Sequence, residues 1–242
     1  MTPHAPAAGS AATRLALARH GETVWHAENR YAGGGSDIDL TDRGRRQAAA
    51  LAAWCRDYAP DAVFCSPVRR AVETATPSAD ATGLPLRLVD DLREVDFGVA
   101  EGHTIDELAA ADPEMVRRFR ADPVAHPFPG SEPPAVAAHR SARALLSIAE
   151  QFTGRRVLVV AHNTLLRLGL CVLLGVPVAR YRSVFPRLDN AAISELSIVS
   201  DQRQPHPAAS LLSMNVQLDT PSEPPGRPGS PPQHTVTKES ST

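Results

Sequence analysis

Residues 156–174 read RVLVVAHNTLLRLGLCVLL and predict a buried strand that leads directly into a helix. The strand, residues 156–161, is apolar on both faces, which is typical of a parallel sheet covered by helices on each side. The helix is expected over residues 163–174, ending before Gly175. His162 stands at the junction between strand and helix, where parallel α/β sheets place their ligand-binding groups.

The same alternation of strand and helix continues along the chain. Further strands are expected over residues 14–18, 62–65, 86–89, 193–199 and 211–217. Further helices are expected over residues 42–56, 66–79, 113–120 and 133–152, and over one more segment that a capping box opens at Thr104. Thr41 is expected to cap the first of these helices, and Ser66 and Pro67 to form the cap and first residue of the second. The alternation predicts a three-layer α/β/α sandwich with a mostly parallel central sheet.

The overall composition excludes several classes of protein. The chain has 242 residues, of which 43% are apolar and 21% charged, as in one soluble globular domain. Its net charge of −2 gives no general attraction to nucleic acid or to anionic membranes. No apolar run reaches the ~18 residues that a membrane span needs, and the N-terminus lacks the features of a signal peptide. We therefore expect a cytoplasmic protein with neither nucleic acid nor membrane among its partners.

Three regions are expected along the chain. Residues 1–12 are rich in alanine and proline, and residues 221–242 hold six prolines and no aromatic residue. Such segments cannot bury enough apolar surface to fold, so both are expected to be disordered tails. Residues 13–220 are expected to form the folded domain. The three cysteines are far apart, lack the spacing of a metal site and indicate a reducing compartment.

Two segments carry basic side chains in positions that suit a bound anion. Arg19 and His20 follow the first strand. A histidine with one unprotonated ring nitrogen can act as a nucleophile, and an adjacent arginine offers a fork of donors to phosphate oxygens. Arg69 and Arg70 are expected in the first turn of a helix, where an anion is favoured. Taken alone, the Arg-His-Gly triplet is more often a surface turn. Two arginines in a first helical turn are mildly costly without an anion, so their placement slightly favours an anion site.

Three other segments add groups of weaker individual significance. Residues 92–102 place Glu94 and other carboxylates in a glycine-containing loop after a strand, where one could act as a general acid. His162 could add charge to a phosphate pocket or be a hydrogen-bonded structural residue. Residues 29–33 and 37–44 form a polar loop before a helix, and a structural role is the simplest interpretation of that loop.

In order and spacing, these five segments resemble the histidine phosphatase superfamily, also called phosphoglycerate mutase-like, over residues 14–217. The resemblance implies that His20 is the phosphorylated nucleophile and that Glu94 is the proton donor. It also implies that Arg19, Arg70 and His162 hold the phosphate. We expect a raised pKa for Glu94, because a proton donor must stay protonated near neutral pH.

Substrate contacts are expected from five further positions, some of which depart from the family's pattern: Thr23, His26, Asn29, Gly33 and Asn163. His26 stands where the family often has asparagine. Asn163 stands where glycine is usual, and since asparagine tolerates positive φ, the turn is expected to survive. Residues 103–140 are expected to cover much of the substrate. Within them, Pro129–Glu132 match the family's Pro-Gly-Gly-Glu-Ser segment only loosely.

The resemblance implies hydrolysis of a small-molecule phosphate monoester through a phosphohistidine on His20, with no metal or other cofactor. The short stretch from Gly102 to Pro129 favours this activity over its alternative, cofactor-dependent phosphoglycerate mutase-type transfer. A non-catalytic phosphate-ligand binding protein is less favoured, because the residues that catalysis needs are all present. A phosphoprotein substrate would have no docking element other than the proline-rich tail. The protein could also form a homodimer.

Overall fold

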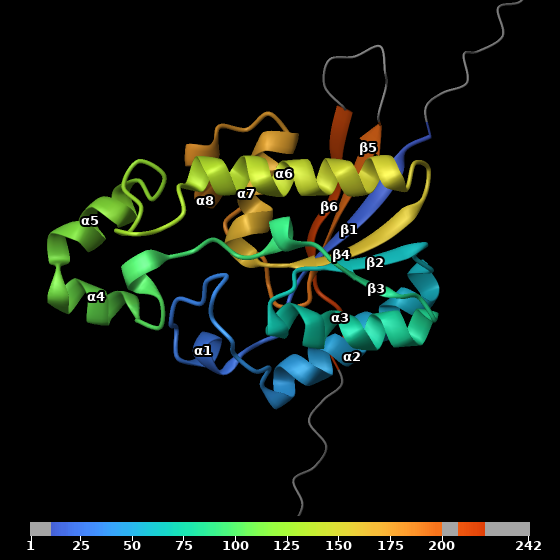
Figure 1. Ribbon diagram of the computed structural model, residues 1–242, viewed down its shortest axis with the longest axis horizontal. Helices are drawn as coiled ribbons and strands as arrows, with labels where there is room; N and C mark the ends of the chain where they lie inside the picture. The colour runs from blue at the N-terminus through green and yellow to red at the C-terminus, as the bar shows by residue number, and fades with distance from the viewer. Residues whose placement is uncertain (1–10, 200–207, 221–242) are drawn as a thin grey trace, which may run out of the picture.

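One mixed sheet runs through the middle of the protein, in the order β3-β2-β4-β1-β5-β6 (Figure 1). The computed structural model describes residues 11–199 and 208–220. The strands are β1 (Thr13–Arg19), β2 (Ala62–Cys65), β3 (Leu86–Leu88), β4 (Arg156–Ala161), β5 (Ile193–Val199) and β6 (Ala208–Val216). Strands β1 to β4 pair in parallel, and β5 and β6 extend the sheet in antiparallel fashion. The predicted α/β fold with a mostly parallel sheet is therefore confirmed.

Helices cover both faces of this sheet. They are α1 (Val24–Ala27), α2 (Asp42–Tyr58), α3 (Arg69–Thr82), α4 (Ile105–Ala111), α5 (Pro113–Ala121), α6 (Pro134–Gln151), α7 (Asn163–Leu173) and α8 (Tyr181–Val184), with 3₁₀ turns η1 (Asp90–Leu92), η2 (Gly98–Ala100) and η3 (Val178–Arg180). Helices α2 and α3 pack on one face, and α6 and α7 on the other. Helices α4 and α5 lie beyond the end of the sheet and pack around Phe119 and Phe128 (Figure 1).

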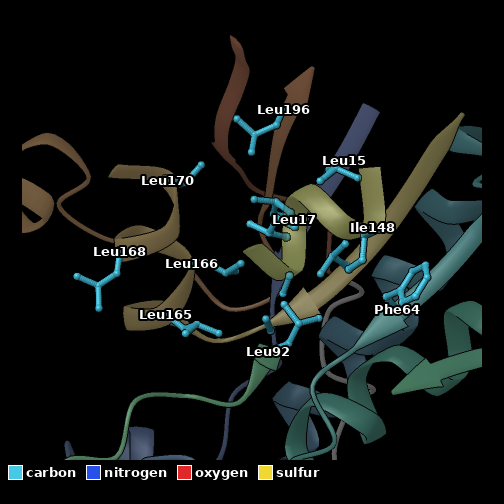
Figure 2. Packing of buried hydrophobic residues seen from close by; sticks show 14 of the residues in the cluster. Leu15, Leu17, Phe64, Leu92, Ile148, Leu165, Leu166, Leu168, Leu170 and Leu196 are labelled. Carbon is cyan, nitrogen blue, oxygen red and sulfur yellow. The ribbon is translucent and has the colours of Figure 1, made fainter. Parts of the chain in front are cut away.

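The position of β4 explains why residues 156–161 are apolar throughout. Val157 and Val159 belong to the core shared with α6 and α7, where leucines from β1 meet Ile148 (Figure 2). Leu158 and Val160 belong to the opposite core, shared with α2 and α3. Successive side chains of a strand point to opposite faces. A central strand between two helical layers therefore needs an apolar residue at every position.

The start of α3 differs from the prediction. This helix begins at Arg69 with Val68 as its N-cap, so Ser66 and Pro67 are not its cap and first residue. The Ser66 hydroxyl accepts a hydrogen bond from the N–H of Val68 at 3.2 Å and lies 2.8 Å from a ring nitrogen of His162. Ser66 therefore closes the turn between β2 and α3, and its hydroxyl is engaged with a histidine instead of a helix end.

Other predicted features lie close to those observed. Thr41 and Thr104 accept hydrogen bonds from the first turns of α2 and α4, as the sequence predicted. Strand β6 begins at Ala208 rather than at residue 211. Both predicted tails lie outside the described residues, apart from residues 11 and 12. Within the described ranges, no helix is both long enough and apolar enough to cross a membrane.

Candidate active site

The sheet brings the two histidine segments together at one edge. Strands β1 and β4 are adjacent and parallel, and Arg19 pairs with Ala161 at their carboxyl ends. The N–H of His20 donates to the carbonyl of Ala161 at 2.9 Å. His20 and His162 therefore leave the sheet side by side, with ring centroids 5.1 Å apart. Strand β2 lies on the other side of β4, and α3, which follows β2, contributes Arg70.

His20 is held in one tautomer by its surroundings. Its Nδ1 lies 2.7 Å from the carbonyl oxygen of Gly21. A carbonyl can only accept, so Nδ1 carries the proton and Nε2 keeps its lone pair. The Nε–H of Arg70 donates to that Nε2 at 3.3 Å. Burial, together with the charge of Arg70, lowers the pKa of His20 well below that of a free histidine. A neutral imidazole of this kind can act as a nucleophile through Nε2.

Arg70 is fully enclosed and engaged with the protein on every side. Its two Nη groups donate to the carbonyls of Ala32, Gly33 and Ser36 at distances of 3.1, 3.0 and 3.0 Å, respectively. These bonds hold the loop between α1 and α2 against the site. Burial lowers the pKa of Arg70, and the charge of Glu94 acts in the opposite direction. Arg70 therefore places a fixed positive charge beside His20.

The Nε–H of Arg19 has no hydrogen-bond partner among the described residues. Nη1 of Arg19 donates to the carbonyl of Leu188 at 2.8 Å, and Nη2 lies against Nε2 of His26. The Nε atom is itself buried. Burial lowers the pKa of Arg19 to about 10, so the group is still a cation at neutral pH. Since an unpaired buried donor is costly, this arrangement suits an acceptor supplied by a ligand.

His26 holds the guanidinium of Arg19 in place. An arginine can only donate, so Nε2 of His26 accepts from Nη2 of Arg19. The proton of neutral His26 therefore lies on Nδ1, which is 2.8 Å from Oγ1 of Thr23. Burial and then the charge of Arg19 lower the pKa of His26 to about 3. The ring of His26 lies 5.1 Å from that of His20, between centroids, so the Arg19 guanidinium that it binds is held beside the nucleophile.

His162 adds an N–H donor, because a hydroxyl occupies its other ring nitrogen. Its Nε2 lies 2.8 Å from Oγ of Ser66, which already accepts from the N–H of Val68. The Ser66 hydroxyl can therefore donate to Nε2, which leaves the proton of His162 on Nδ1. That Nδ1 is buried and has no partner within the part of the chain that the structure describes. Burial and the charge of Arg70 lower the pKa of His162 well below its usual value, so it acts as a neutral donor.

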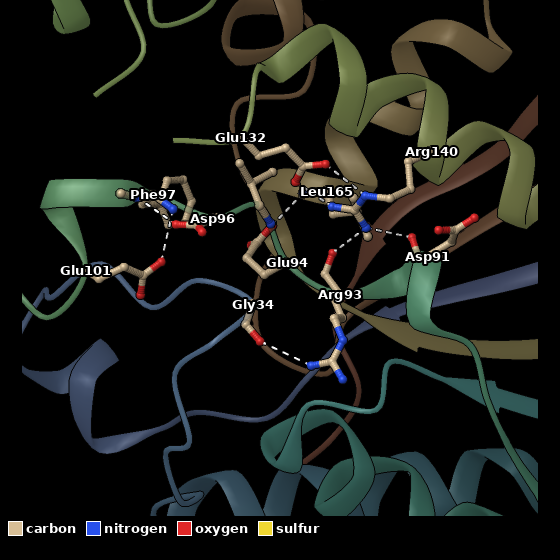
Figure 3. A network of polar contacts seen from close by, with 12 residues as sticks. Gly34, Asp91, Arg93, Glu94, Asp96, Phe97, Glu101, Glu132, Arg140 and Leu165 are labelled. Carbon is tan, nitrogen blue, oxygen red and sulfur yellow. Dashed lines mark hydrogen bonds and ion pairs between the residues drawn. The ribbon is translucent and has the colours of Figure 1, made fainter. Parts of the chain in front are cut away.

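Glu94 is fixed at the N-terminus of α7. Its Oε1 accepts from the N–H groups of Val95 and Leu165 at 2.9 and 2.8 Å, and its Oε2 accepts from the N–H of Thr164 at 3.0 Å. Figure 3 shows this carboxylate between the Gly34 loop and the helix. Burial raises the pKa of Glu94, although the three N–H bonds and Arg70 act against the rise. The direction agrees with the raised pKa expected from the sequence.

Together these groups form a site for an anion. The guanidinium groups of Arg19 and Arg70 and the Nδ1–H of His162 surround His20, and His26 holds Arg19 in place. His20 is only 2% exposed, so water is largely kept from its Nε2. Over the residues that the structure describes, no three His, Cys, Asp or Glu side chains are grouped in a way that could hold a metal ion.

Three of the predicted substrate contacts lie in different surroundings. The N–H of Gly33 donates to Glu101 at 2.8 Å, and a Cβ at Gly33 would come within 1.7 Å of that carboxylate, so this glycine shapes the loop. Asn29 is exposed and adopts a φ of 56°. Asn163 is the first residue of α7 and has no positive φ. The turn that was expected to need a glycine-like backbone is therefore an ordinary helix start. The Asn163 amide oxygen accepts from the N–H of Leu188 at 3.3 Å.

Some residues that position the nucleophile were not found from the sequence. Asn190 donates its amide to the carbonyl of His20 at 2.9 Å, across 170 positions of sequence. Thr74 accepts from the N–H of Gly21 at 2.9 Å. Thr74 lies on the helix predicted over residues 66–79, but that prediction gave no sign of its contact with Gly21. Asn190 follows no recognisable pattern, because its role depends only on the return of the chain to β1.

The fold and the site define a class of protein that the family comparison identifies. The model of the histidine phosphatase superfamily, branch 1, matches residues 15–207, and the protein belongs to this superfamily. It is 33% identical over 181 residues to phosphoserine phosphatase 1 of Hydrogenobacter thermophilus, with 75% of this chain and 84% of the relative covered. A solved structure of a mycobacterial glucosyl-3-phosphoglycerate phosphatase has a TM-score of 0.76 and 29% identity, covering 85% of this chain and 100% of that chain.

Two other relatives differ in length or in name. A protein of Mycobacterium tuberculosis named as bifunctional is 41% identical over 163 residues, which are 65% of this chain and 44% of the relative. The chain thus spans less than half the length of that relative. A protein of Salmonella paratyphi C, named probable phosphoglycerate mutase, is 33% identical over 186 residues, with 77% of this chain and 85% of the relative covered.

Proposed function

We propose that the protein hydrolyses the phosphate monoester of a small molecule through a phosphohistidine formed on Nε2 of His20. The tautomer of His20 carries this proposal. Its Nδ1–H is bound to the carbonyl of Gly21 at 2.7 Å, which directs the Nε2 lone pair toward a set of N–H donors. The relatives named phosphoserine phosphatase and glucosyl-3-phosphoglycerate phosphatase support the same class of reaction.

In the first step, Nε2 of His20 attacks the phosphorus in line with the ester oxygen. The N–P bond forms as the P–O bond to the leaving group breaks. Arg19 and His162 donate to the phosphoryl oxygens, Arg70 adds its fixed positive charge, and together they stabilise the charge spread over these oxygens. Glu94, whose pKa is raised by burial, gives its proton to the departing oxygen.

In the second step, Glu94 accepts a proton from a water molecule that attacks the phosphorus. The N–P bond breaks, inorganic phosphate is released, and Nε2 of His20 regains its lone pair. Glu94 thus alternates between acid and base, and its place at the N-terminus of α7 supports this, because the N–H groups of Thr164 and Leu165 stabilise the carboxylate form.

Mutase-type transfer is the second candidate, because one relative carries that name. A mutase must protect phospho-His20 from water and return the phosphoryl group to a second substrate. The stretch from Gly102 to Pro129 is short, which favours hydrolysis. Incubation with 3-phosphoglycerate and 2,3-bisphosphoglycerate separates the two, since a phosphatase releases inorganic phosphate and a mutase forms 2-phosphoglycerate. Cytoplasmic location and a homodimeric assembly stay predictions from the sequence.

The nucleophile is tested with His20→Ala and a radiolabelled phosphate ester. The wild-type protein should give an acid-labile phosphoenzyme after rapid quenching and should turn over p-nitrophenyl phosphate. His20→Ala should do neither while keeping the wild-type circular dichroism spectrum. His139→Ala is the matched control, since His139 lies exposed on α6, and it should behave as the wild type. Turnover close to the wild-type rate in His20→Ala would reject the phosphohistidine.

A further inference from the structure

A cavity of about 230 Å³ is lined by residues that adjoin Glu94. Val95, which follows Glu94, lines it, as does Thr164, whose N–H binds the Glu94 carboxylate at 3.0 Å. Asn163, which follows His162, lines it as well. The cavity therefore begins beside the group proposed to protonate the leaving oxygen. The part of the substrate that departs with that oxygen is expected to occupy this space.

The wall of the cavity that faces away from the sheet is aromatic. Phe119 and Phe128 stack with ring centroids 3.8 Å apart, and Tyr31 meets Phe128 edge-on at 5.3 Å. All three line the cavity, together with Phe97. Aromatic walls of this kind bind flat apolar groups by burying their faces and by edge contacts. The leaving group should accordingly have an aromatic or similarly flat apolar body.

The same cavity is lined by Arg182, whose charge has no ion-pair partner among the described residues. The guanidinium of Arg182 lies 4.6 Å from the centroid of Phe119, and its Nε donates to the hydroxyl of Tyr181 at 3.0 Å. No carboxylate in the described ranges lies within ion-pair distance of Arg182. The carboxylate of the lining residue Glu132 is taken up by Arg140 at 2.6 Å. Arg182 is thus free to bind an anionic group of a ligand.

A second polar atom in the wall of the cavity also lacks a hydrogen-bond partner among the described residues. The Oγ of Ser131 is buried, and it makes no hydrogen bond to the residues that the structure describes. Ser131 lines the cavity beside Phe128. A buried hydroxyl without a partner is costly, and an oxygen or nitrogen of a bound ligand would satisfy it. This observation is independent of Arg182 and points to the same occupant.

A second hollow lies on the other side of Glu132, and both arginines that line it are paired with carboxylates. It is lined by Glu94, Arg93 and Arg140, among other residues. Arg93 is paired with Asp90 at 3.3 Å and Arg140 with Glu132 at 2.6 Å, as Figure 3 shows for Arg140. Its cations are therefore neutralised, whereas the aromatic cavity keeps Arg182 available.

We propose that this cavity binds the leaving group of the substrate, and that the substrate is the phosphate ester of an alcohol with an aromatic or flat apolar body and a carboxylate that Arg182 binds. The inference rests on the proposed phosphatase function of His20. The aromatic side chains supply the contact area for the body of the leaving group. Arg182 supplies the charge that selects its carboxylate.

Three alkyl phosphates test the two parts of this inference, because their leaving alcohols differ little in reactivity. They are benzyl phosphate, 4-carboxybenzyl phosphate and phosphoglycolate, which carry the ring, the ring with the carboxylate, and the carboxylate alone. The wild-type protein should show the highest kcat/KM with 4-carboxybenzyl phosphate. A charge-assisted hydrogen bond contributes enough to make this advantage over benzyl phosphate roughly tenfold.

Arg182→Gln should abolish that advantage. Its kcat/KM for 4-carboxybenzyl phosphate should fall roughly tenfold further than its kcat/KM for benzyl phosphate. Arg182→Lys keeps the charge and should restore part of the difference. Arg180→Gln is the matched control, since Arg180 lies two residues earlier, is exposed and does not line the cavity. It should leave both values unchanged.

The outcomes separate the inference from the function on which it rests. In one outcome, all three esters are hydrolysed in a His20-dependent manner, with a wild-type kcat/KM that neither the ring nor the carboxylate raises. That result would reject the leaving-group inference and leave the proposed phosphatase function intact. An equal loss on both benzyl esters in Arg182→Gln rejects it too. Hydrolysis that persists in His20→Ala would overturn the proposed function and, with it, this inference.

Discussion

At the residue scale, three histidines face one point, each held in a different way. The carbonyl of Gly21 fixes the proton of His20 on Nδ1, and the hydroxyl of Ser66 does the same for His162 by donating to Nε2. Nε2 of His26 accepts from Arg19, which leaves its proton on Nδ1 toward Thr23. His20 therefore presents a lone pair to the site, His162 presents an N–H group, and His26 accepts from Arg19. Only the neutral forms give this combination, so protonation should disturb the site.

His26 gives this pH dependence a measurable sign. Burial and Arg19 lower its pKa from 6.5 to about 3. Between these values the unfolded chain protonates the histidine while the folded protein keeps it neutral. The unfolded state then binds more protons, so the free energy of unfolding falls as the pH is lowered through this window. One such histidine contributes at most about 1.4 kcal/mol per pH unit.

His26→Asn should therefore lose less stability than the wild type between pH 6.5 and 5, as measured by urea unfolding. Asparagine cannot be protonated, and it is the residue that the superfamily often has here, so phosphatase activity should be retained. His139→Asn removes an exposed histidine and should follow the wild-type pH dependence. Identical losses in the wild type and in His26→Asn would show that this histidine is not held neutral by the fold.

At the scale of elements, the site is assembled from the carboxyl ends of β1, β2 and β4 and from the N-terminus of α7. The alternation of strands and helices predicted this arrangement, because parallel strands place their carboxyl ends together. The start of α3 was predicted wrongly, since Ser66 looks like an N-cap in sequence. Its hydroxyl instead meets His162, which is 96 positions away in the chain. A local pattern cannot distinguish a cap from such a long-range contact.

Ser66→Ala should accordingly impair catalysis more than it impairs folding. Without the hydroxyl, nothing fixes the proton of His162 on Nδ1, and the donor toward the phosphoryl group is lost in part of the molecules. We expect kcat/KM to fall by roughly tenfold or more, as for loss of one preorganised donor, with a loss of about 1 kcal/mol in unfolding free energy.

Ser141→Ala is the matched control for this change. Ser141 is buried on α6, and its hydroxyl has no hydrogen-bond partner in the described part of the protein. Like Ser66→Ala, the Ser141→Ala substitution removes a buried hydroxyl, but this hydroxyl does not touch His162. The kcat/KM of Ser141→Ala should therefore stay at the wild-type value. Equal activity in Ser66→Ala and Ser141→Ala would mean that the Ser66 hydroxyl has no part in orienting His162.

At the scale of the whole molecule, the sequence predicted the layers and most of the groups around His20. It did not predict the groups that hold them. Arg70 binds three carbonyls of the loop after α1, and Asn190 reaches the carbonyl of His20 from the chain before β5. The aromatic cavity joins α5 to residues from α7 and α8. Each depends on how distant segments pack, and single-sequence patterns carry no information about that packing.

The convergence of elements on one anion site predicts that a bound anion stabilises the entire fold. Arg19 belongs to β1, Arg70 to α3, and His162 follows β4, so one phosphate would bridge segments that separate on unfolding. Inorganic phosphate at 100 times its Kd should add about 2.7 kcal/mol to the unfolding free energy. For a domain of this size that corresponds to a rise in Tm of roughly 5–10 °C, which differential scanning fluorimetry can measure.

The rise should depend on the donors and not on ionic strength. Chloride at the same ionic strength should leave Tm nearly unchanged. Arg19→Gln should lose most of the phosphate-dependent rise, because it removes both the cation and the unpartnered Nε donor. Arg56→Gln, which removes an exposed arginine of α2, should keep the full rise. A full rise in Arg19→Gln would place the bound phosphate elsewhere on the protein and would contradict the assignment of the anion site to the end of β1.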